Sequence, residues 1–171
     1  MTDDPWRIRL VLGGARSGKS RHAQALAEAC AAPWRFVATA QAFDAEMAER
    51  IAHHRADRSA AWATIEAPLA LPETIAAVDD GVLLVDCLTL WTSNLMLAEV
   101  DTDVATDALI AALTRSSVRI VLVSNEVGWG IVPDNALARR FRDVAGRVNQ
   151  RVAAAADRVD LLVAGLPMSL K

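Results

Sequence analysis

The sequence predicts a single α/β domain in which a mostly parallel sheet is covered by helices on both faces. Short apolar runs of strand length alternate with longer segments of helical periodicity along the chain. That alternation is typical of strand–helix–strand units, which build parallel sheets. No internal repeat or low-complexity linker divides residues 1–171, and a chain of this length can bury a substantial core.

Composition excludes several classes of protein. The net charge of −3 gives no electrostatic reason to expect a nucleic-acid partner. No apolar run approaches the ~20 residues that a membrane span requires. The acidic segment Met1–Trp6 has no apolar core of a signal peptide. Cys30 and Cys87 are too few for a zinc site or a disulfide framework and lie in apolar stretches, so we expect buried free thiols in a cytoplasmic protein.

The first predicted strand-to-helix junction carries the strongest functional signal. Ile8, Leu10, Val11 and Leu12 are apolar in the manner of a buried strand, and an alanine-rich helix former follows at Arg21–Ala29. Between them, Gly13–Ser20 (G-G-A-R-S-G-K-S) fits G-x-x-x-x-G-K-[ST] at every fixed position. A glycine-rich turn could match by chance, but pattern and context agree. The prediction is therefore a P-loop NTPase fold of the RecA-like type.

The chemistry of such a loop is phosphate capture. Glycines 13, 14 and 18 let backbone N–H groups turn toward phosphate oxygens, and the helix that follows adds its positive end. We expect Lys19 to reach the β- and γ-phosphates of GTP or ATP. The Ser20 hydroxyl is expected to ligate Mg²⁺.

The next segments predict a strand at Trp34–Thr39, whose end at Ala38–Gln41 lies where α/β folds bind ligands. A helix is expected from an N-cap at Asp44 to about Arg58. Its apolar periodicity directs His54 toward the protein body and His53 toward solvent. His54 could equally be a hydrogen-bonded core histidine, and the charges that follow it could be a solvated helix end.

A further metal ligand is expected at the end of the strand Gly81–Asp86. A buried strand that ends in Asp commonly supplies the outer ligand of Mg²⁺ in P-loop proteins. The alternative is that Asp86 caps the helix expected at Leu88–Leu97. Before this strand we expect an edge strand at Trp62–Glu66 and a weak helix at Pro68–Val78.

The second half predicts two helices and two strands. A helix at Asp101–Arg115 should bury Val104, Ala108, Leu109, Ala112 and Leu113, and a strand should span Val118–Ser124. After a loop at Asn125–Pro133, in which Trp129 either presents an aromatic face or enters the core, comes the longest helix. It is expected from an N-cap at Asp134 to about Asp157, with an apolar stripe of Leu137, Phe141, Val144, Val148 and Val152. A last strand at Val159–Ala164 closes the chain, and residues 165–167 turn out of it.

Along nearly its whole length the sequence resembles the bifunctional adenosylcobinamide kinase / adenosylcobinamide-phosphate guanylyltransferases of cobalamin biosynthesis. A P-loop alone would name only a superfamily, whereas the later motifs are far more specific. The matching segments are G-G-A-R-S-G-K-S-R-H-A at Gly13–Ala23, A-T-A-Q at Ala38–Gln41, E-M-A-E-R-I-A-H-H-R at Glu46–Arg55, D-C-L-T-L-W at Asp86–Trp91, N-E-V-G-W-G-I-V-P at Asn125–Pro133 and F-R-D-V-A-G-R-V-N-Q-R-V at Phe141–Val152.

The resemblance implies two reactions: phosphorylation of adenosylcobinamide by ATP or GTP, then transfer of GMP from GTP to adenosylcobinamide phosphate. It also implies a covalent GMP–histidine intermediate. The family's histidine follows an isoleucine by three places, as His54 follows Ile51, so His54 is our choice and His53 the reserve. A neutral imidazole, with a pKa near ~6.5, is a suitable nucleophile.

The family's nucleotide contacts map onto five parts of this chain, and its members are trimers with shared active sites. A homotrimer is therefore expected here. The implied nucleotide-binding residues are Gly13, Gly14, Ala15, Arg16, Ser17, Gly18, Lys19, Ser20, Ala38, Thr39, Ala40, Arg55, Ala56, Asp57, Arg58, Glu66 and Asp86, with Ser20 and Asp86 as the metal ligands and His54 and Lys19 as the catalytic residues.

Two other functions compete with this interpretation. One is an ordinary P-loop small-molecule kinase in which His54 is purely structural. The other is a nucleotide-switch module such as a small GTPase, which would carry [NT]-K-x-D after a strand. The only candidate segment, Ser124–Val127, lacks both the lysine and the aspartate, which argues against the switch module.

Overall fold

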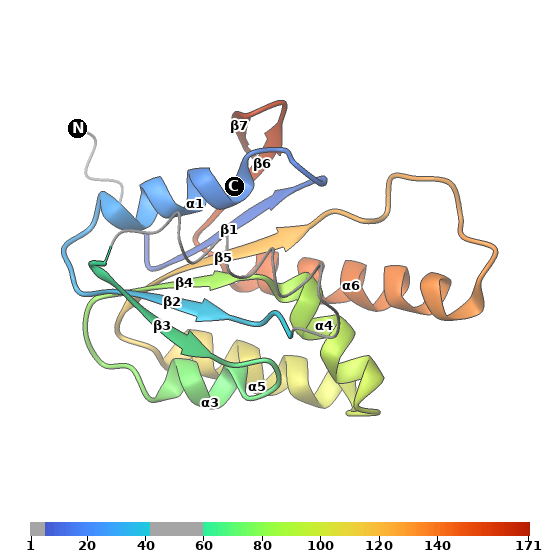
Figure 1. Ribbon diagram of the computed structural model, residues 1–171, viewed down its shortest axis with the longest axis horizontal. Coiled ribbons are helices and arrows are strands. Elements are labelled where there is room, and N and C mark those ends of the chain that lie inside the picture. The colour runs from blue at the N-terminus through green and yellow to red at the C-terminus, as the bar shows by residue number, and fades with distance from the viewer. Residues whose placement is uncertain (1–5, 42–59) are drawn as a thin grey trace.

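The computed structural model describes residues 6–41 and 60–171, which form a seven-stranded sheet with helices on both sides (Figure 1). The strand order is β3-β2-β4-β5-β1-β6-β7. All neighbouring pairs are parallel except β6 and β7, which are antiparallel. The strands are β1 (Ile8–Gly13), β2 (Trp34–Ala38), β3 (Trp62–Glu66), β4 (Val82–Asp86), β5 (Arg119–Asn125), β6 (Arg158–Val163) and β7 (Leu166–Ser169).

The helices divide between the two faces of the sheet. Figure 1 shows α1 on one side and the other described helices on the opposite side. Their bounds are α1 (Lys19–Glu28), α3 (Leu71–Ala76), α4 (Leu88–Leu97), α5 (Thr102–Arg115) and α6 (Ala136–Ala155). The P-loop between β1 and α1, the parallel sheet and the helices on both faces confirm the predicted fold class. The helix expected at residues 44–58 lies outside the described residues.

Two apolar cores follow from the alternation of side chains along the strands. In β5, Ile120 and Leu122 join the larger core under α3, α4, α5 and α6, whereas Val121 and Val123 join the smaller core under α1. The central strands are therefore apolar on both faces, which explains their nearly continuous hydrophobic runs. Within the described ranges, no helix has the length and apolarity to cross a bilayer.

The C-terminal segment departs from the prediction. Residues 165–167 do not leave the sheet, because Leu166 begins β7, which pairs antiparallel with β6. The turn consists of Ala164 and Gly165, both at positive φ (52° and 81°), as the tightest hairpins require. Alanine is rare in that conformation, so the residue types at this turn do not predict a hairpin. Pro167 is tolerated because β7 is an edge strand.

The predicted buried faces of two helices were partly wrong. In α5, Val104 is 64% exposed and Ala108 is also exposed, whereas Thr106 is buried beside Leu109 and Leu113. Thr106 can be buried because its hydroxyl donates a hydrogen bond to the carbonyl of Thr102.

In α6, Val144, Val148 and Val152 are buried as predicted, but Leu137 in the first turn is 56% exposed and lines an open groove beside Met96 and Leu97 of α4. The N-cap of α6 is Asn135, not Asp134. The Asn135 side-chain oxygen accepts from the N–H groups of Leu137 and Ala138. Both cysteines are free, as expected, although Cys30 is only half-buried.

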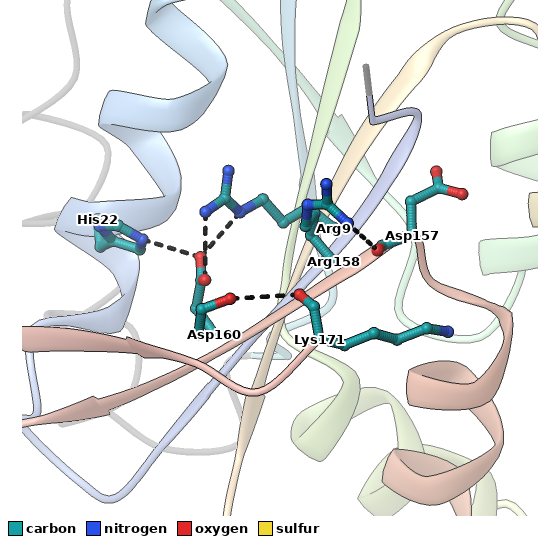
Figure 2. Close-up of polar contacts among 7 residues, drawn as sticks. Arg9, His22, Asp157, Arg158, Asp160 and Lys171 are labelled. Carbon is teal, nitrogen blue, oxygen red and sulfur yellow. Dashed lines mark hydrogen bonds and ion pairs between the residues drawn. The ribbon is translucent and has the colours of Figure 1, made fainter. Parts of the chain in front are cut away.

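A buried carboxylate fastens α1 to the sheet. Asp160 of β6 is 2% exposed and lies on the α1 side. Figure 2 shows Arg9 of β1 and His22 of α1 directed at it. Arg9 donates from Nε at 2.8 Å and from Nη2 at 3.1 Å, and His22 Nε2 lies 3.1 Å from the same carboxylate. Because a buried carboxylate is stable only when it is paired, these contacts fix α1 relative to β1 and β6.

A second carboxylate, Asp157, holds the start of β1. Its Oδ2 accepts from the backbone N–H groups of Arg7 and Ile8, both at 2.8 Å. These hydrogen bonds, that of Ile8 foremost, lower the pKa of Asp157. A carboxyl group with a lowered folded-state pKa stabilises the fold above its unfolded pKa of ~3.9. That stabilisation is lost as the pH falls through the folded value.

We therefore expect Asp157→Asn to lower the free energy of unfolding by about 1 kcal/mol near neutral pH, a low value for a charged hydrogen bond because the side chain is exposed. The difference from wild type should shrink as the pH falls from about 7 to about 3. Urea unfolding across that range measures it, with the exposed Asp143→Asn as the control. If the difference in unfolding free energy between Asp157→Asn and wild type stayed constant with pH, the Asp157 carboxylate would not be the stabilising group.

Candidate active site

The P-loop connects the buried strand β1 to α1 through a close backbone approach. A Cβ atom on Gly13 would lie 2.4 Å from Ser17 Oγ and 2.9 Å from the carbonyl oxygen of Leu162, so only glycine fits there. Gly18, the N-cap of α1, has φ 94° and thus also requires glycine. The sequence motif therefore has the tight turn that phosphate binding needs.

The β6–β7 turn supports the P-loop from behind. The Gly165 N–H donates to the Ser17 carbonyl at 2.9 Å, and a Cβ on Gly18 would lie 3.3 Å from Gly165 Cα. Ser17 is buried, and within the part of the chain that the structure describes its Oγ has no hydrogen-bond partner. Of the other predicted loop residues, Gly14, Ala15 and Arg16 are exposed and Ser20 is half-buried.

Lys19 at the start of α1 interacts electrostatically with Asp86 at the end of β4. Burial lowers the pKa of Lys19, and the Asp86 carboxylate acts in the opposite direction. Burial and the charge of Asp86 together raise the pKa of the Cys87 thiol to about 11. The Lys19 ammonium donates to the Gly14 carbonyl at 3.0 Å, so it lies against the concavity of the loop. The structure thus brings together two predicted site residues that are far apart in sequence.

The alternative role of Asp86 as a helix cap is wrong. The N-cap of α4 is Cys87, and no side chain caps that helix. Val82 and Leu84 belong to the core under α1, so alternation puts Asp86 on the α1 face, where Lys19 lies. Asp86 is therefore directed toward the P-loop side of the sheet.

The end of β2 aligns with Asp86 and Glu66. Ala38, the last residue of β2, lies opposite Asp86 of β4 on one side and opposite Glu66 of β3 on the other. Glu66 is exposed, because β3 is an edge strand. Thr39 is fully buried, and its hydroxyl bonds to the carbonyl (2.7 Å) and the N–H (2.8 Å) of Cys87. The Asn94 amide donates to the Thr39 carbonyl at 2.8 Å. Thr39 thus holds β2, β4 and α4 together with its own polar groups, and Ala40 beside it is half-buried.

Sequence reasoning missed the polar residues at the end of β5. Ser124 Oγ lies 3.3 Å from Thr89 Oγ1 and donates to Asn149 at 2.7 Å. Asn125 pairs in register with Gly13, beside the P-loop. Ligands of α/β folds bind at the carboxyl ends of parallel strands, which is why Ala38–Gln41 was predicted to lie near a ligand. The same reasoning applies to Asn125, because it also ends a parallel strand.

The loop after β5 is attached to α6 by arginines. Arg142 donates to the Gly128 carbonyl at 2.5 Å, and Arg139 donates to the carbonyls of Pro133 and Asp134 at 2.9 and 2.6 Å. Trp129 is 74% exposed, so its interpretation as a core residue is wrong and that of a presented aromatic face is confirmed.

Several predicted site residues cannot be placed in this geometry. His54 and its reserve His53, together with the neighbouring Arg55, Ala56, Asp57 and Arg58, lie outside the described residues 6–41 and 60–171. The histidine and the basic patch therefore stay predictions from the sequence.

Comparison with known proteins identifies relatives over nearly the full chain. The sequence pattern of the family described as "Cobinamide kinase / cobinamide phosphate guanyltransferase" matches residues 9–170. The bifunctional adenosylcobalamin biosynthesis protein CobP of Pseudomonas aeruginosa is 50% identical over 166 residues, covering 95% of this chain and 96% of that protein. The CobU proteins of the same description from Salmonella typhimurium and Escherichia coli are 47% and 45% identical over 179 residues, covering 95% of this chain and 98% of each relative.

A solved structure, the P4 protein from bacteriophage phi6 in complex with ADP, compares with a TM-score of 0.44 at 16% identity. The comparison covers 95% of this chain and 52% of P4, so the chain spans about half the length of that protein.

The enzyme relatives agree with the resemblance seen in the sequence motifs, and they extend it to nearly every element of the fold. A family match over residues 9–170 includes the P-loop, the Asp86 strand and the loop after β5. The chain belongs to the cobinamide kinase / cobinamide phosphate guanyltransferase family.

Proposed function

We propose that this chain phosphorylates the aminopropanol hydroxyl of adenosylcobinamide with ATP or GTP, and then transfers GMP from GTP to that phosphate. The products of the second reaction are adenosylcobinamide-GDP and pyrophosphate. The observation that carries the proposal is the P-loop with Lys19 against its Gly14 carbonyl and Asp86 on the same face of the sheet, in a chain of this family. Both reactions need a bound triphosphate, and the P-loop is the element that can bind it.

Phosphotransfer depends mainly on positioning and charge. Backbone N–H groups of the loop and the N-terminus of α1 bind the β- and γ-phosphates. Lys19 moves from the Gly14 carbonyl to these phosphates and neutralises charge on the leaving nucleoside diphosphate.

The side-chain oxygen atoms of Ser20 and Asp86, at the carboxyl edge of the sheet, are suitable ligands for Mg²⁺. It usually takes one or two protein oxygens and completes its shell with water and phosphate. Ser20 in the first turn of α1 and Asp86 at the end of β4 would hold it. Within residues 6–41 and 60–171, no three His, Cys, Asp or Glu side chains are grouped so that they could hold a metal ion. Bound there, Mg²⁺ supplies charge neutralisation at the phosphates.

Guanylyl transfer would use His54 as the nucleophile. A neutral imidazole nitrogen attacks the α-phosphorus of GTP, the bond to the β-phosphate oxygen breaks, and pyrophosphate leaves with the electron pair. The phosphate of adenosylcobinamide phosphate then attacks the same phosphorus and releases the histidine. Arg55 and Arg58 could bind the anionic groups beside it.

A homotrimer in the cytoplasm completes the proposal. Nucleoside triphosphates are cytoplasmic substrates, and the exposed apolar surface near the site would suit a neighbouring subunit. A groove of about 290 Å³ beside Met96 and Phe141 is part of this surface. Its exposed apolar residues include Leu97, Trp129, Ile131, Val132 and Leu137.

His54→Ala should abolish a covalent adduct formed with GTP labelled at the α-phosphate, because the nucleophile is removed. Phosphorylation of adenosylcobinamide should continue. Acid lability and alkali stability of the wild-type adduct identify it as a phosphoramidate. The matched control is His53→Ala, which should retain the adduct. If neither the wild type nor any variant formed an adduct, the chain would be a kinase only.

Lys19→Ala should lower both activities by at least ~100-fold, the scale expected when a preorganised charge is removed from a transition state. Steady-state assays of each reaction measure the loss. The chain has one other lysine, Lys171, whose ammonium caps the C-terminal end of α6. Lys171→Ala is therefore the control and should stay active. Guanylyl transfer that survived Lys19→Ala would show that the two reactions do not share the P-loop.

Asp86→Asn should raise the Mg²⁺ concentration needed for half-maximal activity by about 10-fold or more, because a carboxylate oxygen is lost from the metal shell. Metal titration at saturating nucleotide measures this change. The control is Asp79→Asn, an exposed carboxylate before β4 at the opposite edge of the sheet. An unchanged titration would remove Asp86 from the metal site.

A further inference from the structure

Asn125 ends the strand that separates the P-loop from Asp86. It pairs in register with Gly13 of β1, and the N–H of the next residue donates to the Gly13 carbonyl at 3.1 Å. On its other side, β5 pairs with β4 so that Val123 is opposite Asp86. Asn125 therefore lies two residues beyond the level of Asp86, at the carboxyl edge and between two parts of the phosphate site.

The side chain of Asn125 is on the α1 face of the sheet. Val121 and Val123 pack in the core under α1, and side chains along a strand alternate, so residue 125 shares their face. Ser124 confirms the alternation, because its hydroxyl contacts Thr89 of α4 and Asn149 of α6 on the opposite face. Lys19 and Asp86 are on the same side as Asn125.

Hydrogen bonds from two helices fix the backbone at this position. The Asn125 N–H donates to the Thr89 hydroxyl at 2.7 Å, and the Asn149 amide donates to the Asn125 carbonyl at 3.1 Å. Thr89 and Asn149 are 7% and 5% exposed, so these bonds are shielded from water. The end of β5 is therefore rigidly placed before any substrate binds.

In contrast to this satisfied backbone, the side-chain oxygen of Asn125 is buried and has no hydrogen-bond partner among residues 6–41 and 60–171. Buried polar atoms without partners are rare in folded proteins, and at a binding site their partner is commonly a ligand. An amide oxygen can only accept, so its partner must be a donor. Ionised phosphate oxygens only accept, which excludes the triphosphate itself as that partner.

We propose that Asn125 orients the hydroxyl group that receives the phosphoryl group. The inference rests on the proposed kinase reaction, whose acceptor is an alcohol. The hydroxyl donates its hydrogen bond to Asn125 Oδ1, which directs an oxygen lone pair at the γ-phosphorus. The oxygen–phosphorus bond forms while the bond to the bridging oxygen breaks and its electrons leave with the nucleoside diphosphate. The hydroxyl proton passes to water, because a carboxamide does not take it.

This role is specific to one of the two reactions. The nucleophile of the guanylyl step is an imidazole, which brings no hydroxyl to the phosphorus. Asn125 should therefore matter for phosphorylation of adenosylcobinamide and not for formation of the GMP adduct. A residue that bound the nucleotide or a metal-bound water would affect both steps.

The test is Asn125→Ala in the full chain, assayed for both half-reactions. We expect kcat for phosphorylation of adenosylcobinamide to fall ~10- to 100-fold, the scale of a misplaced nucleophile, with KM for ATP and the Mg²⁺ requirement within about 2-fold of wild type. The rate of adduct formation from α-labelled GTP should be unchanged. Asp101→Ala, which removes the N-cap of α5 away from the site, controls for a general loss of stability and should keep both activities.

Three results would overturn the inference: an unchanged kinase kcat, an equal loss in both half-reactions, or a raised Mg²⁺ requirement. Thermal unfolding of both variants is measured alongside the assays. If Asp101→Ala lowered the melting temperature as much as Asn125→Ala and lost the same kinase activity, the loss would reflect stability and would also contradict the inference. Wild-type phosphorylation of adenosylcobinamide, measured first in the same assay, tests the proposed function separately.

Discussion

Parallel pairing of β2, β4, β5 and β1 is the constraint on which the site depends. Because parallel strands end at the same edge of the sheet, the residues at their ends lie close together in space although they are far apart in the sequence. Gly13, Asn125, Asp86 and Ala38 are the last residues of these four strands. A shift of one residue in any pair would move a side chain such as Asp86 to the opposite face and away from Lys19.

Buried polar contacts fix these strand ends more specifically than the apolar core can. The core consists largely of valine and leucine, which pack in many ways. By contrast, the Thr39 hydroxyl pairs with both backbone groups of Cys87, and Asn149 accepts from Ser124 while it donates to Asn125. Hydrogen bonds of this kind have one satisfactory geometry, and their loss would leave buried polar atoms unpaired. We infer that they set the positions of the ligand edge.

The P-loop is supported on two sides. The β6–β7 turn contacts its outer surface through Gly165, and the Asp160 cluster attaches α1 to β1 and β6. Both supports come from the last strands of the chain, more than a hundred residues after the loop that they hold. The C-terminal hairpin is thus part of the nucleotide-binding framework, although it contributes none of the phosphate-binding motif.

The sequence by itself determined the P-loop, the strand that ends in Asp86 and the alternation of strands and helices, because each depends on a local pattern or a short motif. It also determined the family, since motifs such as Asn125–Pro133 are specific. Local patterns could not reveal that Val104 is exposed while Thr106 is buried, that Ala164 adopts a positive φ, or that Asp160 pairs with Arg9 and His22. Only the tertiary structure decided these features, because each depends on partners distant in sequence or on backbone angles that the residue type disfavours. The buried side-chain oxygen of Asn125, which has no partner among the described residues, belongs with them, because the position of its strand end depends on contacts with β1, α4 and α6.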